Sequence, residues 1–477
     1  MVARAATLVA MARALGACFV MLVVMSCKDT SSPAVVAPVA DGAPAKDAAA
    51  HALTLDPSIT SMLSSTDSAR IATNIKTLVA FGTRSSCSDA SLTTQGIGAA
   101  RDWIQTRLTA LPGAQVQLFA YDQTGCATTA KRHDVIAYWP SATHPNRLVV
   151  IGGHYDSRPV SVSDGTSAAP GANDSGSQTA VVLEAANAMV GQTLDASLLF
   201  VAFAGEEQGL VGSAALAKAI GTLFPGAAVE AMLNCDIVGG DSTSNDATAQ
   251  KQFRLYSPGT PRELLAGDGT TDNTSPSRGL MRFVGTWGGA YVPAMTMLPK
   301  LREDRPGRGG DHEPFIAQGY PGVRFIEPVE TLAHQHSPDD LFNYVTPDYT
   351  ANIARLVIAV GASLARAPSA PASFGGSGSA ASPVFTWVAP ASGKVDHYVL
   401  AARPVTENFY RMRVPARTTT ASPSASELGI DPGVPYFVSV AAVDAAGHES
   451  LFAYPEYRCD DSACVVPAGA LDVTATN

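Results

Sequence analysis

The chain has 477 residues, of which 46% are hydrophobic and 16% are charged, so it has enough apolar residues for two folded domains and is not a disordered chain. Its 32 basic and 42 acidic residues give a formal net charge of −10, and the Lys and Arg residues form no cluster. This charge pattern excludes a typical nucleic-acid-binding protein.

The first residues have the pattern of an export signal, which we assign to residues 1–26. Arg4 and Arg13 precede an apolar stretch from Leu15 to Met25 that is too short for a membrane-spanning helix. The stretch ends in a small residue followed by Cys27, as in bacterial lipoprotein processing sites, and this would place a lipid anchor on Cys27. A plain secretory signal cut nearby is the alternative. We therefore expect an exported protein, either lipid-anchored in the bacterial envelope or secreted.

Composition separates residues 27–56 from residues 57–366. The first segment is rich in Ala, Pro, Ser and Asp without a helical or strand period, so we expect a disordered tether. In the second segment strand-like and helix-like runs alternate, which predicts an α/β domain with a largely parallel sheet and helices on both faces. The strand-like runs include Leu148–Gly153, Leu198–Ala204, Val229–Leu233 and Gly322–Ile326.

Short β-like runs separated by turn residues dominate the rest of the chain. Residues 367–382 are rich in Gly, Ser and Pro and are predicted to form a linker, and residues 383–465 are predicted to form a small all-β sandwich. Trp387 and the run Leu428–Tyr436, which is similar to a tyrosine corner, make this segment resemble a fibronectin type III domain. We expect residues 466–477 to form a tail.

The cysteines indicate an oxidising compartment. Cys87 and Cys126 lie in polar loops that flank one predicted helix–strand unit, and we expect them to form a disulfide. We expect a second disulfide between Cys459 and Cys464. Cys235 is left over inside an apolar strand, where a free thiol behaves as a small buried hydrophobic group.

Acidic and imidazole side chains lie where the predicted strands end or where loops begin. In an open α/β sheet the carboxyl ends of the strands form the rim at which ligands bind. Two imidazoles and three carboxylates at such a rim are a nitrogen and oxygen ligand set suited to zinc. These candidates are His154, Asp174, Glu207, Asp236 and His336.

The charges of these candidates favour two zinc ions over one, because three carboxylates and two divalent ions leave a single positive charge that one hydroxide would cancel. Asp174 is the natural bridge between two ions, since its place at a helix start leaves both oxygens free. Glu206 precedes Glu207 on an extended segment and points the opposite way, so it is free to act as a general base. Asp156 follows His154 by two residues and can hold its imidazole from behind.

Five segments in fixed order resemble a known enzyme family. They are Gly152–Ser157, Gly171–Gly176, Gly205–Glu207, Asn234–Asp236 and His336–Asp340. With them, about residues 80 to 366 resemble the co-catalytic two-zinc exopeptidases, a family that includes secreted bacterial leucyl aminopeptidases, and we assign residues 57–366 to this domain. The resemblance implies a three-layer αβα zinc peptidase domain.

The resemblance also implies roles for individual residues. Two zinc ions would share Asp174 as a bridging ligand, and the peptide bond after Asp174 is expected to be cis. Glu207 and His336 would complete one zinc site, while His154 and Asp236 would complete the other.

Four more residues are assigned around these ligands. Asp311 and His312 match a family segment near the substrate side. Gln335 stands where some relatives carry a Tyr that stabilises the tetrahedral intermediate, so the residue that serves this purpose is left open. Asp340 either supports the site from behind or caps a helix that begins after Ser337.

These residues predict an aminopeptidase that hydrolyses N-terminal residues from peptides, with Glu206 moving the proton and two zinc ions per chain. We expect a monomer. A glutaminyl cyclase with one zinc, a carboxypeptidase on the same scaffold, and a catalytically inactive surface binding protein are the alternatives.

Overall fold

The computed structural model describes residues 53–241, 247–259, 275–304 and 308–467. The chain divides into two units, Met1–Asp41 and Gly42–Asn477. The predicted signal segment, Cys27, most of the predicted tether and the last ten residues lie outside the described residues. Among the described residues, no helix combines the length and the apolar character needed to cross a bilayer.

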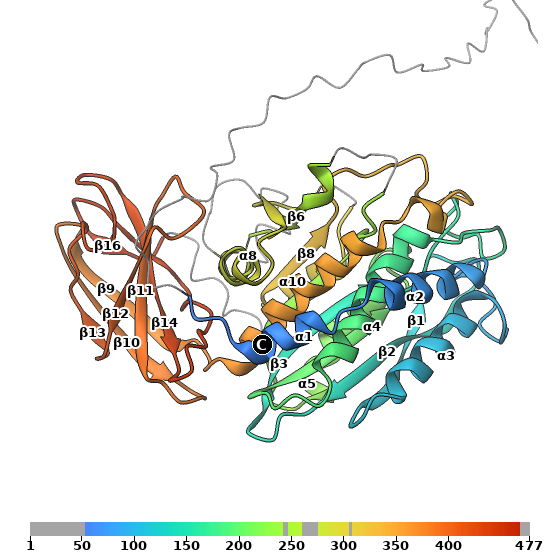
Figure 1. Ribbon diagram of the computed structural model, residues 1–477, viewed down its shortest axis with the longest axis horizontal. Helices are drawn as coiled ribbons and strands as arrows, with labels where there is room; N and C mark the ends of the chain where they lie inside the picture. Colours follow the sequence, from blue (N-terminus) through green and yellow to red (C-terminus); the bar gives the residue numbers. More distant parts are fainter. Residues whose placement is uncertain (1–52, 242–246, 260–274, 305–307, 468–477) are drawn as a thin grey trace, which may run out of the picture. The chain divides into compact units, whose positions relative to one another are not determined.

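An eight-stranded mixed sheet forms the centre of the larger domain (Figure 1), in the order β1-β2-β4-β3-β5-β8-β6-β7. The central pairs β4–β3, β3–β5 and β5–β8 are parallel, whereas β1–β2, β2–β4 and β6–β8 are antiparallel. The sheet is therefore parallel at its centre and mixed towards its edges. The strands are β1 (Gln115–Gln123), β2 (Ala130–Trp139), β3 (His144–His154), β4 (Ala196–Phe203), β5 (Ala228–Cys235), β6 (Gln252–Tyr256), β7 (Thr296–Lys300) and β8 (Gly322–Ile326).

Helices cover both faces of this sheet, and this confirms the predicted three-layer α/β fold. Strand β4 is buried at every position, because helices lie above and below it, and its continuous apolar sequence reflects that burial. One face carries α1 (Pro57–Ser64), α2 (Ser68–Ala80), α3 (Gly96–Thr109), α4 (Gln178–Met189) and α10 (Pro347–Arg366), and the other carries α5 (Val211–Leu223) and α9 (His312–Ala317).

Short elements complete this domain. They lie in the connections between the longer helices and strands. They are η1 (Ala172–Ser177), η3 (Ala249–Lys251), α7 (Pro276–Phe283), η4 (Val284–Gly288), α8 (Gly289–Tyr291) and η5 (Phe342–Tyr344).

Two antiparallel sheets form the C-terminal domain around a core that includes Trp387, Tyr398 and Tyr436. The ring of Trp387 packs edge-on against Tyr398 with a centroid distance of 5.4 Å. One sheet contains β9 (Pro371–Ser379), β10 (Ser382–Pro390) and β13 (Thr420–Ala421), and the other contains β11 (His397–Pro404), β12 (Met412–Ala416), β14 (Tyr436–Val443), β15 (Tyr457–Cys459) and β16 (Cys464–Val465).

Two sequence predictions for this domain are wrong. The expected linker, residues 367–382, contains strand β9, whose backbone pairs with β10 and whose Phe374 is buried in the core. Backbone pairing thus gives this Gly- and Ser-rich segment a regular structure that its side chains do not indicate. The hydroxyl group of Tyr436 is buried and forms no hydrogen bond among the described residues, so the hydrogen bond that defines a tyrosine corner is absent.

The cysteines form two disulfides, Cys87–Cys126 and Cys459–Cys464, which close loops with sequence separations of 39 and 5 residues. Cys235 at the end of β5 is a buried free thiol. Burial in this apolar strand raises its pKa well above the ordinary range, so the thiol stays neutral.

A buried ionic cluster joins the C-terminal domain to the α/β domain. The Glu456 carboxylate lies 2.6 Å from Arg403 of β11 and 3.2 Å from Arg282 of α7, and it accepts a hydrogen bond from the Tyr410 hydroxyl at 2.7 Å. Arg282 also donates a hydrogen bond to the backbone oxygen of Asn408. Because these charged groups are almost fully buried, each depends on the others for the interactions that water would otherwise supply.

Replacing Glu456 with Ala is expected to lower the free energy of unfolding by about 3–5 kcal/mol, because it removes a buried carboxylate that pairs with both Arg282 and Arg403. Chemical denaturation measures the change. Asp122→Ala is the control, since Asp122 pairs with Lys131 on the exposed surface and should change stability by less than about 1 kcal/mol. Equal losses in both variants would show that the cluster does not hold the domains together.

Candidate metal centre

Three neighbouring strands end at one edge of the sheet and bring their following residues together. β3 pairs in parallel with β4 on one side and with β5 on the other. His154 is the last residue of β3, Glu206 and Glu207 follow β4, and Asp236 directly follows β5. Parallel neighbours place their carboxyl ends at the same edge, so these four side chains share one rim.

A glycine turns the chain between β4 and the Glu206–Glu207 pair. Gly205 has a φ of +72°, in the left-handed region that favours glycine. A Cβ atom at this position would also lie 2.3 Å from the Gln123 side-chain oxygen. Both the backbone conformation and the close packing therefore require glycine here, and the turn fixes how the two glutamates enter the site.

Asp174 enters the site from element η1, and Asp340 holds it in place. The two oxygens of the buried Asp340 carboxylate accept hydrogen bonds from the backbone NH groups of Asn173 and Asp174 at 2.8 and 2.9 Å. The Asp174–Ser175 peptide bond is cis, which confirms the prediction. Asp340 thus fixes the backbone from which Asp174 projects.

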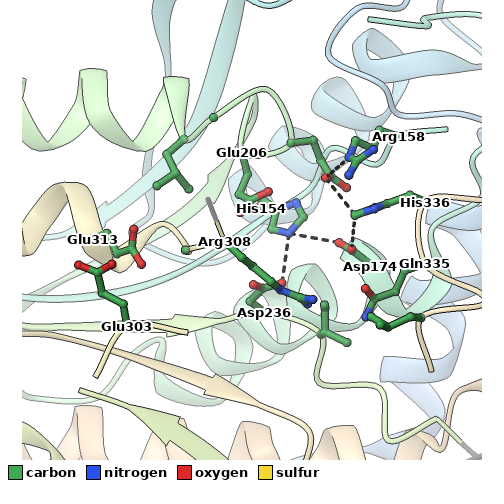
Figure 2. A pocket seen from close by; sticks show the side chains of 16 residues that line it. His154, Arg158, Asp174, Glu206, Asp236, Glu303, Arg308, Glu313, Gln335 and His336 are labelled. Atoms are coloured by element: carbon green, nitrogen blue, oxygen red, sulfur yellow. Dashed lines mark hydrogen bonds and ion pairs between the residues drawn. The ribbon is translucent and has the colours of Figure 1, made fainter. Parts of the chain in front are cut away.

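The five predicted ligand residues converge in the structure, and Figure 2 labels His154, Asp174, Asp236 and His336 among them. The two oxygens of Asp174 face different imidazoles: Oδ1 lies 3.4 Å from His154 Nε2, and Oδ2 lies 3.2 Å from His336 Nε2. Glu207 Oε2 lies 3.3 Å from His336 Nε2, and Asp236 Oδ1 lies 3.4 Å from His154 Nε2. The side chains therefore form two groups that share Asp174.

These side chains line one end of a cavity of about 660 Å³. Glu206 also lines it. Figure 2 shows Glu303 and Glu313 close to one another on the side of the cavity away from His336, with Arg308 between them and the histidines. The cavity is thus large enough for a small peptide segment and mostly charged.

Two arginines of this cavity, Arg158 and Arg308, were not among the residues predicted from the sequence. Arg158 Nε donates a hydrogen bond to Glu207 Oε2 at 2.8 Å, and Arg308 pairs with Glu330 and Asp304. Arg158 lies four residues after the end of β3, and this position near a strand end could have indicated that it belongs to the site. Arg308 belongs to a loop without a readable period, so only the fold brings it to the site.

The three residues predicted to lie on the substrate side differ in whether they line the cavity. Gln335 lines the cavity and donates a hydrogen bond to Glu330. Asp311 and His312 do not line it, and both are buried. The start of α9 packs against β8, where a Cβ on Gly322 would lie 3.1 Å from the His312 backbone oxygen. This packing turns the segment into the interior and away from the cavity lining, and its assignment to the substrate side stays a prediction.

The crowded carboxylates shift the pKa values of the site. Burial raises the pKa of Glu206 well above its ordinary value, and although His154 opposes this effect, the negative charges of Glu207 and Asp236 add to it. Burial disfavours the charged form of His336, but the carboxylates of Asp174 and Glu207 outweigh it and raise its pKa to about 10. The site therefore has an excess of negative charge that attracts protons or other cations.

Two buried oxygen atoms show that a metal fits this donor set. Asp174 Oδ1 and Glu207 Oε1 accept no hydrogen bond among the described residues. Such atoms are costly to bury unless a cation or a donor faces them. The His154 imidazole lies within 4.8 Å of carboxylate oxygens in two groups, one with Asp174 and Glu207 and one with Glu206 and Asp236, and this mixture of nitrogen and oxygen ligands suits zinc.

The fold and this site define a metallopeptidase, and comparison with known proteins gives its family. Residues 134–361 match the sequence profile of Peptidase family M28. A probable zinc metalloprotease of Leptosphaeria maculans is 36% identical over 340 residues, which cover 66% of this chain and 78% of that protein. One of Pyrenophora tritici-repentis is 32% identical over 381 residues, which cover 74% and 87%. The chain belongs to peptidase family M28.

A solved structure shares the fold. The crystal structure of Legionella pneumophila LapA aminopeptidase aligns with a TM-score of 0.51 and 18% identity, covering 68% of this chain and 78% of that one. The predicted class of zinc metallopeptidase is thus confirmed at the level of the family. Both sequence relatives are fungal, so the predicted location in a bacterial envelope gains no support from them.

Zinc is expected to stabilise the purified protein, because it binds the folded carboxylate cluster and not the unfolded chain. At a free zinc concentration one hundred times the dissociation constant, the gain is about 2.7 kcal/mol. Thermal unfolding with zinc and after chelation measures it. Asp174→Asn should remove the gain, whereas Asp339→Asn, an exposed acid in the His336 loop, should keep it. A full gain in Asp174→Asn would contradict the site.

Proposed function

We propose that the protein is a two-zinc aminopeptidase. Asp174 would bind both ions, Glu207 and His336 would hold one, and His154 and Asp236 would hold the other. The observation that carries this proposal is the position of Asp174, whose two oxygens face two different imidazoles at 3.4 and 3.2 Å. Asp156 supports the set from behind, since its Oδ1 lies 3.4 Å from His154 Nδ1.

Glu206 is the general base of the proposed reaction. When bound, two zinc ions acidify the attacking water and polarise the peptide carbonyl. Glu206 takes the proton of that water while the carbon–oxygen bond forms, and then passes it to the leaving amine as the carbon–nitrogen bond breaks. Glu206 lines the cavity beside the proposed ligands, which places it within reach of that water. The proposed ligand Glu207 is the next residue in the chain, so the turn at Gly205 positions both the base and the ligand.

The charges at the far end of the cavity favour an amine as the recognised end of the peptide. Glu303 and Glu313 lie there, and Glu303 Oε1 is buried without a hydrogen bond among the described residues. Arg308 is occupied by Glu330 and Asp304. Carboxylates attract the ammonium group of a free N-terminus and repel a free C-terminal carboxylate, which supports an aminopeptidase over a carboxypeptidase.

We extend the proposal to the rest of the chain. The disulfides support export to an oxidising compartment, with residues 1–26 as the signal segment and Cys27 as a lipid attachment point. We assign residues 57–366 to the peptidase domain and the sandwich that follows to a fibronectin type III-like domain, and we propose a monomer related to the secreted leucyl aminopeptidases.

Glu206→Gln is expected to lower kcat by about 10²–10⁴-fold, because it removes the proton acceptor but no zinc ligand. Hydrolysis of aminoacyl reporter substrates by the zinc-loaded protein measures the loss. Zinc content should stay at two ions per chain in Glu206→Gln and fall in Glu207→Gln. Full activity of Glu206→Gln would contradict its role as the base.

The same assay separates the alternatives. Reporter peptides with a free N-terminus should be cleaved, whereas reporters with a blocked N-terminus and a free C-terminus should not. A single zinc ion per chain together with cyclisation of N-terminal glutamine would contradict the proposal and favour a glutaminyl cyclase.

A further inference from the structure

One buried hydroxyl group connects two parts of the metal centre. Ser86 lies in the segment between α2 and α3 and is fully buried. Its Oγ donates a hydrogen bond to Asp156 Oδ2 at 3.1 Å and accepts one from the backbone NH of Gly205 at 2.9 Å. These two partners follow different strands, β3 and β4. Ser86 therefore links the two strand ends through a single atom.

The first partner of Ser86 acts on a histidine of the site. Asp156 Oδ1 lies 3.4 Å from His154 Nδ1 and accepts no hydrogen bond among the described residues. The other carboxylate oxygen, Oδ2, is the one that Ser86 holds. His154 Nδ1 also lies at hydrogen-bond distance, 3.1 Å, from the Asp156 backbone oxygen, so the backbone and the carboxylate of Asp156 both face the ring and together orient it.

The second partner of Ser86 precedes the glutamate pair. Gly205 is the turn residue after β4, and Glu206 and Glu207 follow it directly. The bond from its NH group to Ser86 fixes the start of that turn. Since neighbouring residues of one short segment move together, a displacement at Gly205 reaches both glutamates.

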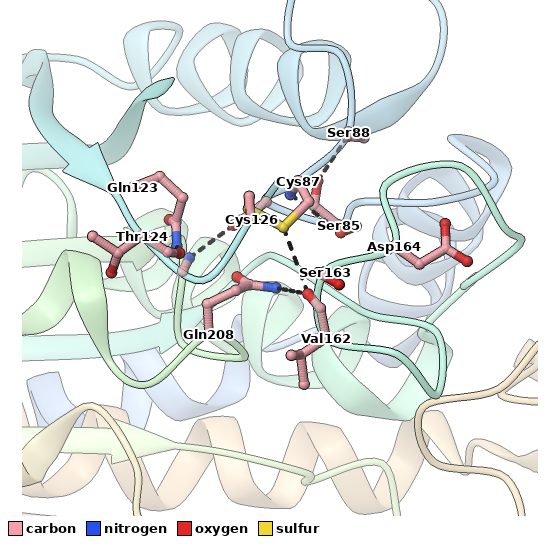
Figure 3. Close-up of a disulfide and its surroundings, with 12 residues drawn as sticks. Ser85, Cys87, Ser88, Gln123, Thr124, Cys126, Val162, Ser163, Asp164 and Gln208 are labelled. Atoms are coloured by element: carbon pink, nitrogen blue, oxygen red, sulfur yellow. Dashed lines mark hydrogen bonds between the residues drawn. A yellow bond between two sulfur atoms is a disulfide. The ribbon is translucent and has the colours of Figure 1, made fainter. Parts of the chain in front are cut away.

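The segment that carries Ser86 is itself held from two sides. Arg132 of β2 donates hydrogen bonds to the backbone oxygens of Ser86 and Ser88 at 2.6 and 2.8 Å. The neighbouring residue, Cys87, forms the disulfide with Cys126 in the turn between β1 and β2 (Figure 3). The segment is thus tied covalently to a hairpin of the sheet.

The hairpin turn also contacts the residue after the glutamate pair. A Cβ on Gly125 would lie 3.0 Å from the Gln208 Cβ, so the turn packs closely on Gln208. Gln208 Nε2 donates a hydrogen bond to the Val162 backbone oxygen at 3.0 Å, and Cys87 Sγ lies 3.5 Å from the same oxygen. Figure 3 shows these groups gathered around the disulfide.

We propose that Ser86 is a positioning residue of the metal centre. Its hydroxyl aligns the His154 ring through Asp156 and the Glu206–Glu207 segment through Gly205, and the Cys87–Cys126 disulfide keeps it in place. This inference rests on the proposed function for its catalytic consequence. The predicted effect of Ser86 on the geometry of the zinc ligands does not depend on any substrate.

Ser86→Ala is expected to weaken zinc binding about tenfold, the lower end of the effect known for residues that support metal ligands. Competition with a chromophoric chelator measures the affinity. In the zinc-loaded variant kcat should fall by a similar factor with KM unchanged, because Ser86 touches no part of the cavity. Ser88→Ala is the matched control, since Ser88 bonds to Ser85 and Ile97 on the same segment and should lose stability without losing zinc affinity.

Two disulfide variants test the second half of the proposal and leave the Ser86 hydroxyl in place. The pair Cys87→Ser with Cys126→Ser should weaken zinc binding severalfold, and adding Ser86→Ala should cost less than it does in the parent protein, because the two changes act through one connection. The pair Cys459→Ser with Cys464→Ser in the C-terminal domain is the control and should leave zinc affinity unchanged.

The outcomes separate this inference from the proposed function. Zinc affinity and kcat that stay at parent values in Ser86→Ala, while Glu206→Gln is inactive, would overturn the inference and leave the function standing. Weakened zinc binding in Ser86→Ala of a parent protein that cleaves no peptide would overturn the function and support the positioning role. If Ser86→Ala does not fold, equal zinc affinities in the two disulfide variants would overturn the inference.

Discussion

The arrangement of this protein depends on one electrostatic constraint: several carboxylates meet in a small, largely buried space at the carboxyl ends of three strands. Asp174 and Glu207 each keep a buried oxygen without a hydrogen bond, and the pKa of Glu206 is raised by burial and by its acidic neighbours. Such a site is unfavourable for the metal-free fold and favourable for a cation. The repulsion between these buried acids lowers the stability of the metal-free fold, and zinc binding is favourable because it removes that repulsion.

The surrounding fold has to hold these acids together against their repulsion, and it does so mainly through the backbone. Asp340 accepts hydrogen bonds from the backbone NH groups of Asn173 and Asp174. Gly205 supplies a turn in the left-handed region that favours glycine, and Ser86 links the segments that follow β3 and β4. None of these groups faces the cavity. The precision of the site therefore comes from a layer of buried hydrogen bonds behind it, which agrees with the general behaviour of metal sites.

The contact between the C-terminal domain and the α/β domain also buries charged groups that depend on one another. It contains Glu456, Arg282 and Arg403, charged groups that satisfy one another out of reach of water. A freely moving appended domain would not bury such a cluster. The profile of the peptidase family covers residues 134–361, so Arg282 lies inside it, whereas Arg403 and Glu456 lie beyond its end.

The sequence by itself determined the α/β fold and the candidates for the metal ligands and the base, because strand ends are visible as apolar runs that stop at polar residues. The interior position of Asp311, the presence of Arg308 in the cavity and the support from Ser86 were decided only by the tertiary structure. Periodicity and motif spacing are local properties of the chain. Burial and hydrogen bonding between distant segments depend on which neighbours the fold supplies, and no local pattern records them.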